Sequence, residues 1–134
     1  MKTKEEQKRK IMIIDDDPDY LGQMVVIIEG LGFEAITAES QKEGEQLLEE
    51  TKPDLAIVDL MMENKDSGFI LSYKLKQKYP ETPVILASAV TAETGLNFNI
   101  ETTDDKTWIK ADKFLEKGIR PDQLEREINK LLKV

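Results

Sequence analysis

The sequence lacks cysteine and histidine altogether, and each absence excludes a kind of chemistry. Without cysteine the chain can form no disulfide, thiolate nucleophile or zinc–thiolate site. Without histidine it has no imidazole metal ligand and no histidine general base, and it cannot itself be a histidine-bearing phosphoryl carrier. The absence of disulfides is compatible with a cytoplasmic location, which we expect for this protein.

Long apolar runs and an excess of basic residues are also missing. No stretch approaches the roughly 18 apolar residues of a membrane helix, and the charged N-terminus leads into an apolar run of only strand length, so we expect neither a membrane span nor a signal peptide. The net charge of −8 argues against a nucleic-acid surface, so we expect neither a membrane nor a nucleic-acid partner. The only basic cluster is mixed with glutamates, and we expect residues 1–9 to be a charged tail before a single domain over residues 10–134.

The most informative residues that are present are three aspartates that follow short apolar runs. Asp15 and Asp16 close the run Ile11–Ile14, and Asp59 closes the run Leu55–Val58. Short apolar runs bounded by polar residues are typical of buried parallel strands, and ligands of open α/β sheets bind outside the carboxyl ends of such strands. Three carboxylates meeting there need a positive partner, and oxygen-only ligands favour Mg²⁺.

Two later segments that we expect to be strands also lead to polar side chains. Val84–Ala87 leads to Ser88, and Phe114–Glu116 leads to Lys117. With the aspartates, the expected strand ends therefore offer acids, a hydroxyl and an ammonium, in that order. This set of residues resembles the receiver domain of two-component response regulators, and the resemblance covers nearly the whole chain, from about Lys10 to Lys133.

The helical segments between the apolar runs complete the predicted fold. Asp17 and Pro18 are typical of a helix start, and Ser40 with Glu43 forms a capping box before a second helix. Alternating strands and helices predict an α/β fold, a flavodoxin-like (βα)5 doubly wound parallel sheet with strand order 2-1-3-4-5. Residues 91–111 have no helical periodicity, so we expect the region of the fourth helix to be remodelled.

The resemblance implies a role for each acidic residue and for the lysine. Asp59 would be the phosphoacceptor, a carboxylate nucleophile that forms an aspartyl phosphate. Asp16, Asp59 and the backbone carbonyl of Met61 would hold Mg²⁺, and Asp15 would orient the water shell of the metal. Lys117 would pair with Asp59 before phosphorylation and with a phosphoryl oxygen afterwards.

Further residues would control the output and lifetime of the phosphorylated state. By resemblance, the Ser88 hydroxyl would donate to a phosphoryl oxygen, and Phe114 matches the switch aromatic of the family. Met61 and Val90 would flank the acyl phosphate, and because neither holds an attacking water strongly, we expect slow self-dephosphorylation. Gly118 stands where the family usually has proline, which leaves open whether the preceding peptide bond is cis.

The resemblance thus implies a signalling phosphoacceptor rather than an enzyme. A sensor histidine kinase or a histidine phosphotransfer protein would supply the phosphoryl group, and an unknown downstream protein would respond to it. The chain shows no effector segment, so we expect a stand-alone receiver that acts through another molecule. Residues 91–111, which include Trp108, are expected to form part of the partner surface with the last strand and helix.

Other interpretations are open. Residues 15–17 also fit the Asp-x-Asp pattern of a small Mg²⁺-dependent phosphohydrolase of the haloacid-dehalogenase type, although Pro18 is an unusual successor and no late Gly-Asp pair follows. A receiver-like scaffold that is never phosphorylated is a third possibility. Taken singly, the aspartates could be helix caps, Lys117 an ordinary surface lysine and Phe114 a plain core residue.

Overall fold

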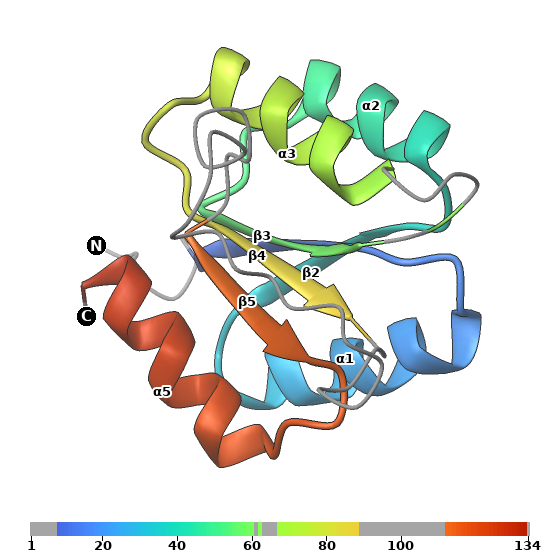
Figure 1. Ribbon diagram of the computed structural model, residues 1–134. Coiled ribbons are helices and arrows are strands. Elements are labelled where there is room, and N and C mark those ends of the chain that lie inside the picture. The colour runs from blue at the N-terminus through green and yellow to red at the C-terminus, as the bar shows by residue number, and fades with distance from the viewer. Residues whose placement is uncertain (1–7, 61, 63–66, 89–111, 134) are drawn as a thin grey trace, which may run out of the picture.

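The protein alternates strands and helices along its length (Figure 1). The computed structural model describes residues 8–60, 62, 67–88 and 112–133. Their elements are β1 (Lys10–Ile14), α1 (Pro18–Gly30), β2 (Glu34–Ala38), α2 (Gln41–Glu50), β3 (Leu55–Asp59), α3 (Ser67–Lys78), β4 (Val84–Ser88), β5 (Lys113–Glu116) and α5 (Pro121–Leu132). None of the helices within these ranges is long and apolar enough to cross a membrane.

All neighbouring strands are parallel, and their order in the sheet is β2-β1-β3-β4-β5. The predicted flavodoxin-like topology is therefore confirmed. Helices α2 and α3 cover one face of the sheet, and α1 and α5 cover the other (Figure 1). Most of the predicted tail and the whole of 91–111, where we expect a remodelled fourth helix, lie outside the described residues.

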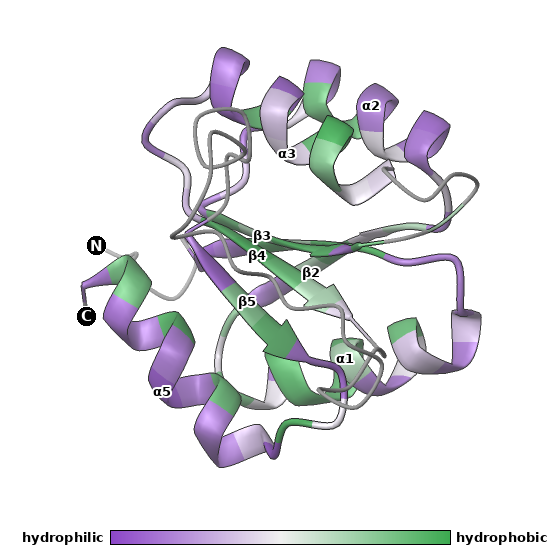
Figure 2. Cartoon of the chain, viewed as in Figure 1, coloured by the Kyte–Doolittle hydropathy of each residue, from purple (hydrophilic) through white to green (hydrophobic). Residues whose placement is uncertain are grey.

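Each buried strand sends alternate side chains to two separate apolar layers. Ile11 and Ile13 pack toward α1 and α5, whereas Met12 and Ile14 pack toward α2 and α3. Both faces of the central strands are apolar for this reason, a pattern typical of a parallel sheet covered by helices. The ribbons of β3 and β4 are accordingly green over most of their length in Figure 2. The two layers hold the strand ends at fixed positions, and polar residues are concentrated at those ends.

Side-chain caps fix where the first two helices begin. Asp17 accepts a hydrogen bond from the backbone N–H of Asp19 at 3.0 Å, as the predicted N-cap requires. Ser40 Oγ accepts from the N–H of Glu43 at 3.0 Å, while Glu43 Oε1 accepts from the N–H of Glu39 at 2.8 Å. The predicted capping box is present, except that Glu43 reaches one residue further back than expected.

Candidate functional site

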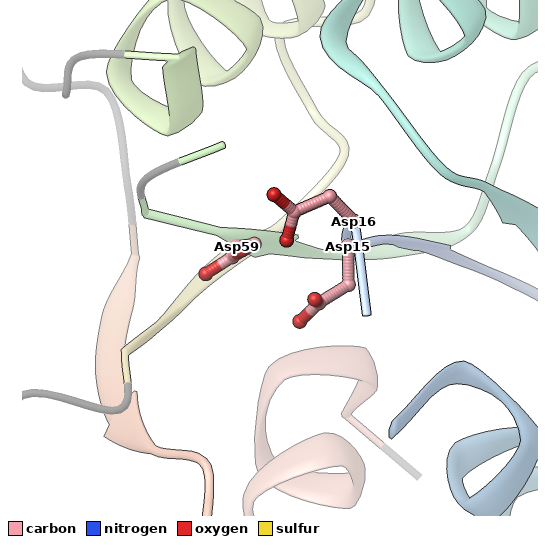
Figure 3. A group of neighbouring side chains, drawn as sticks. All are labelled: Asp15, Asp16 and Asp59. Atoms are coloured by element: carbon pink, nitrogen blue, oxygen red, sulfur yellow. The ribbon is translucent and has the colours of Figure 1, made fainter. Parts of the chain in front are cut away.

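Three aspartates from neighbouring strands meet at the carboxyl edge of the sheet (Figure 3). Asp15 follows β1 and Asp59 ends β3, and these strands are paired side by side. One carboxylate oxygen from each of Asp15, Asp16 and Asp59 lies within 4.8 Å of the others. Asp15 and Asp59 are buried, at 1% and 6% exposure, whereas Asp16 is open to solvent. The acids that the sequence analysis grouped are thus adjacent in space.

Asp15 divides its two oxygens between the backbone and the centre of the site. Its Oδ1 accepts a hydrogen bond from the N–H of Asp17 at 2.9 Å, which fixes the carboxylate in place. Its Oδ2 is buried and has no hydrogen-bond partner among the described residues. That oxygen instead forms an ion pair with the ammonium of Lys117 at 2.7 Å.

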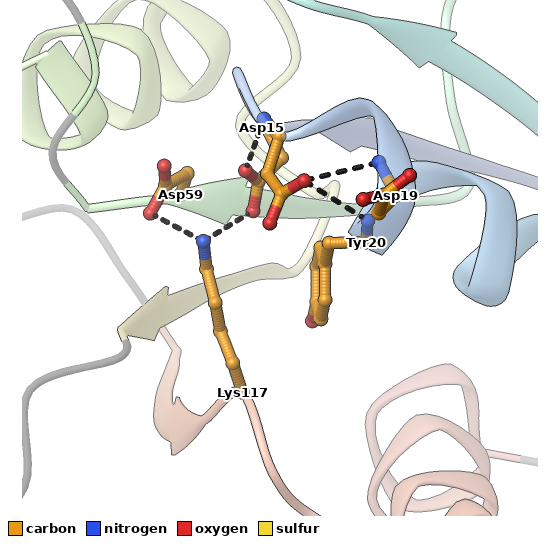
Figure 4. Close-up of polar contacts among 6 residues, drawn as sticks. Asp15, Asp19, Tyr20, Asp59 and Lys117 are labelled. Carbon is orange, nitrogen blue, oxygen red and sulfur yellow. Dashed lines mark hydrogen bonds and ion pairs between the residues drawn. The ribbon is translucent and has the colours of Figure 1, made fainter.

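Lys117 contributes the one ammonium of this group, and it follows β5, the strand at the edge of the sheet. Its backbone N–H donates to the carbonyl of Ser88 at 3.0 Å, which places the residue directly beyond β5. Its Nζ lies 3.3 Å from Oδ1 of Asp59 and 2.7 Å from Oδ2 of Asp15 (Figure 4). The expected ion pair with Asp59 is present, and the shorter contact with Asp15 was not anticipated from the sequence.

Burial and the crowding of the acids both shift pKa values in the site. Burial, and next the charge of Asp15, raise the pKa of Asp59 to about 6 even though Lys117 opposes the change. Burial disfavours the charge of Lys117, but the two carboxylates outweigh it and raise the pKa of the ammonium. The carboxylates therefore keep an excess of negative charge that one ammonium does not balance.

The site fits a hard divalent cation. The group offers only carboxylate oxygens, and the single ammonium beside them does not balance their charge. Mg²⁺ takes oxygen ligands and is held through a few carboxylates, with its other positions left to water or phosphate oxygens. Asp15, Asp16 and Asp59 would hold the ion. The backbone carbonyl of Met61, also predicted as a ligand, lies outside the described residues.

Ser88 and Phe114 lie on the strands that border the acids. Ser88 ends β4, is 6% exposed, and stands beside the strand that carries Asp59. Phe114 lies in β5 and packs edge-on against Phe69 of α3, with ring centroids 6.5 Å apart. Phe114 is thus part of the apolar layer under α2 and α3. The role of Phe114 as a switch residue stays a prediction. Val90, which we expect to flank the acyl phosphate, lies outside the described residues.

Tyr20 belongs to the site although the sequence analysis did not select it. It lies in the first turn of α1, and the Lys117 ammonium stands 4.9 Å from its ring centroid. Burial, with Asp15 and Asp59 adding to it, raises the pKa of Tyr20 to about 12. A tyrosine in a helix gives no sequence pattern that points to a lysine almost a hundred residues away.

Gly68 is a second residue that the sequence analysis missed. Its N–H donates to the carbonyl of Leu60 at 2.9 Å, so that α3 begins directly against the end of β3. A Cβ atom at this position would lie 2.4 Å from the carbonyl oxygen of Asp59 and 2.7 Å from Cα of Leu60. Only glycine allows this approach, and Gly68 therefore helps to set the backbone that carries Asp59.

Comparison with known proteins assigns this arrangement to a family. The family model for the response regulator receiver domain matches residues 11–129. The transcriptional regulatory protein GlrR of Escherichia coli is 35% identical over 79 residues, which are 59% of this chain and 18% of GlrR. The chain spans half or less of the length of the curated relatives that it matches, from 18% to 49%.

Solved structures show the same fold. A CheY-like receiver domain protein from Methanospirillum hungatei superposes with a TM-score of 0.78 at 22% identity, covering 94% of both chains. TrrA from Thermotoga maritima, a response regulator crystallised in complex with Mg²⁺–BeF, gives a TM-score of 0.75 at 24% identity, covering 92% of this chain and 98% of TrrA.

The peptide bond between Lys117 and Gly118 is trans, since no cis peptide bond occurs among the described residues.

Proposed function

This chain belongs to the response regulator receiver family of two-component signalling, and from that membership we propose that it accepts a phosphoryl group on Asp59. One observation carries the proposal: the Asp59 carboxylate lies among two further acids, within 3.3 Å of the Lys117 ammonium. A carboxylate is a competent nucleophile when positive charge offsets its repulsion of a phosphoryl group.

The proposed step transfers one phosphoryl group to Asp59. A carboxylate oxygen of Asp59 forms a bond to phosphorus as the bond from phosphorus to the donor nitrogen of a phosphohistidine breaks. The electron pair of that bond stays on the imidazole nitrogen, and Asp59 becomes a mixed anhydride. Lys117, already 3.3 Å from this carboxylate, neutralises charge on the phosphoryl oxygens.

Mg²⁺ would supply the remaining positive charge, as a Lewis acid that offsets the charge of phosphoryl oxygens. Asp15 and Asp59 are buried, so their charges act in a medium that screens them little. Asp16 is exposed and gives the cation an approach from solvent. The Mg²⁺ in the complex of TrrA, a protein of the same fold, is consistent with this assignment.

The phosphoryl group would act as a switch for partner binding. Ser88 lies at the end of the strand next to Asp59, where its hydroxyl could donate to a phosphoryl oxygen. A change there would pass to Phe114 through the pairing of β4 with β5, in which Ser88 lies opposite Glu116 and Leu86 lies opposite Phe114. The donor would be a sensor histidine kinase or a histidine phosphotransfer protein, and the downstream partner would be a protein that reads this face.

The alternatives from the sequence are less favoured. A haloacid-dehalogenase-type phosphohydrolase would use Asp15 as nucleophile, but Asp15 is 1% exposed and pairs with Lys117 at 2.7 Å. The family match over residues 11–129 also assigns the chain to receivers. A receiver-like scaffold that is never phosphorylated has the same fold, and the experiment below distinguishes it.

The test is the intact mass of the protein after incubation with acetyl phosphate and Mg²⁺. We expect a gain of one phosphoryl group in the parent, and no gain with a chelator or in Asp59→Asn. Asp54→Asn is the matched control, because Asp54 precedes the same strand at its opposite end and accepts a hydrogen bond that asparagine can also accept.

The outcomes separate the interpretations. Labelling of the parent and of Asp54→Asn, without labelling of Asp59→Asn, supports the proposal. Labelling that persists in Asp59→Asn would place the acceptor elsewhere. A parent that gains no mass with acetyl phosphate, and none with a panel of phosphorylated histidine donors, would leave the unphosphorylated scaffold as the function.

A further inference from the structure

We infer that the ring of Tyr20 holds the Lys117 ammonium in line with Asp59, which makes Tyr20 a positioning residue for phosphoryl transfer. The inference rests on the proposed function and adds a residue to it. Tyr20 has no charge and does not touch the reacting atoms. Its effect would pass through Lys117, the one ammonium within ion-pair distance of both buried acids among the described residues.

The ammonium of Lys117 is held on three sides. The carboxylates of Asp15 and Asp59 lie at 2.7 Å and 3.3 Å, and the centroid of the Tyr20 ring lies at 4.9 Å. Figure 4 shows the Nζ of Lys117 between the two acids, with the Tyr20 ring next to it. A cation at this distance from an aromatic ring is attracted by it, and more strongly where water is partly excluded. Lys117 is such a case, with 18% of its side chain exposed.

The backbone around Lys117 offers little other restraint on its side chain. The main-chain N–H is anchored to Ser88, but β5 ends one residue earlier and Gly118 follows. The turn that follows is held by main-chain contact, where the N–H of Ile119 donates to the carbonyl of Glu116 at 3.2 Å, and this leaves the Lys117 side chain itself unrestrained. A lysine side chain has four rotatable bonds, and an aromatic ring next to the ammonium reduces the number of directions in which the ammonium can point.

Tyr20 is itself firmly placed. Asp17 accepts hydrogen bonds from the first turn of α1, and Pro18 begins the helix. The Tyr20 ring packs against the apolar layer under α1 and α5. The ring is therefore part of a rigid element, whereas the lysine that it contacts follows the end of a strand.

A neutral ring suits a lysine that must exchange partners. In the proposed reaction the ammonium moves from carboxylate oxygens to phosphoryl oxygens. A further carboxylate at the position of Tyr20 would compete with the phosphoryl group for the ammonium, whereas the ring attracts the cation without adding charge. We therefore expect Tyr20 to affect the rate of transfer more than the identity of the acceptor.

The test compares Tyr20→Leu and Tyr20→Met, which keep apolar bulk and lose the ring, with Tyr20→Phe, which keeps the ring. With acetyl phosphate and Mg²⁺, we expect Leu and Met to lower the labelling rate of Asp59 by roughly 3- to 10-fold, the range of a partly desolvated cation–π contact. Phe should restore the parental rate. Thermal melts of every variant show that each is folded at the temperature of the assay.

A second readout does not depend on phosphorylation. In protein labelled with ¹³C at the lysine ε carbons, the Lys117 resonance is assigned by its loss in Lys117→Arg. A nearby aromatic ring shifts the attached ε protons upfield, so we expect that shift in the parent and in Tyr20→Phe, and its loss in Tyr20→Leu and Tyr20→Met.

Each result has a defined meaning. Parental labelling rates in both Leu and Met would overturn the positioning role, even if the ring shift disappears. A Phe variant as slow as Leu would assign the effect to the hydroxyl and overturn the role of the ring. A parent that is never labelled would refute the proposed function instead, and the ring shift would then decide whether Tyr20 holds Lys117 at all.

Discussion

The two ends of the sheet both carry aspartates, but the aspartates at each end serve opposite purposes. At the amino edge, Asp54 accepts a hydrogen bond from the N–H of Lys10 at 2.7 Å. Asp112 accepts from the N–H of Val84 at 2.8 Å and pairs with Lys76 at 2.9 Å. Each of these acids therefore accepts a hydrogen bond from a backbone N–H, which joins the start of β3 to that of β1 and the start of β5 to that of β4.

At the carboxyl edge the acids face one another. Asp15, Asp16 and Asp59 approach within 4.8 Å, and the pKa of Asp59 is raised to about 6 by burial and by its neighbours. Gathering carboxylates in this way lowers the stability of the metal-free fold, since burial and neighbouring like charges both disfavour the ionised form. The comparison teaches that the carboxyl edge is arranged for a cation and a phosphoryl group at a cost in stability, whereas the amino edge stabilises the fold.

The largest effect on stability is expected from Gly68→Ala. The new Cβ would lie 2.4 Å from the carbonyl oxygen of Asp59, and a backbone atom cannot move aside as a flexible side chain can. We expect a loss of about 3 kcal/mol in the free energy of unfolding, at the upper end of the cost of overpacking. Urea denaturation of parent and variant measures the difference.

The matched control is Gly22→Ala, in α1, where a Cβ would meet nothing within 4 Å. Alanine is the better helix former, so this variant should gain about 0.5–1 kcal/mol. Equal and small effects at both positions would show that α3 does not need its close approach to the end of β3, and that Gly68 does not help to place Asp59.

The next largest effect is expected from Asp59→Asn, and it has the opposite sign. Because the folded protein raises the pKa of Asp59 from 3.8 to about 6, ionised Asp59 destabilises the metal-free fold above that pH. Removal of the charge should stabilise the metal-free protein by about 2 kcal/mol at pH 8. Chemical denaturation in the presence of a chelator measures it.

The pH dependence gives the sharper form of this test. The penalty is fully present above about pH 6 and fades as the pH falls toward the unfolded value of 3.8, so the advantage of Asp59→Asn should shrink over that range. Asp112→Asn is the control at the amino edge, where loss of the Lys76 ion pair should cost less than about 1 kcal/mol. A pH-independent gain in Asp59→Asn, or a gain in Asp112→Asn, would contradict the comparison of the two edges.

The sequence alone predicted the features that follow from local patterns. Apolar runs of strand length indicated the strands, and their alternation with helices, together with the rule of right-handed crossovers, favoured the flavodoxin-like order. Asp17 and Ser40 marked the starts of their helices. The meeting of Asp15 with Asp59 was predictable as well, because parallel strands that lie side by side end at the same edge.

Contacts that depend on packing between distant segments were not predictable. Tyr20 reaches Lys117 only because α1 and the end of β5 lie against the same part of the sheet, and no spacing in the sequence encodes that distance. Gly68 resembles an ordinary helix-start glycine until the carbonyl of Asp59 is placed beside it. The preference of Lys117 for Asp15 likewise depends on a difference of a few tenths of an ångström.

The smallest effect on stability is expected from Asp16→Ala, because Asp16 is the exposed member of the acidic group. Without metal, removal of one like charge should raise the free energy of unfolding by less than about 0.5 kcal/mol, since water screens an exposed charge. Binding of Mg²⁺ should nevertheless weaken, roughly tenfold or more, since a direct ligand matters at least as much as the outer-shell partners that cost this amount. Thermal melts with and without Mg²⁺ show both effects, because a ligand that binds only the folded state raises its stability by mass action.

The control for charge is Asp19→Ala, which removes another exposed acid, from the first turn of α1, and should leave Mg²⁺ affinity close to that of the parent. If Asp16→Ala and Asp19→Ala bound Mg²⁺ equally well, the cation would be held by the buried pair alone, and the carboxyl edge would differ from the amino edge only in the crowding of Asp15 and Asp59.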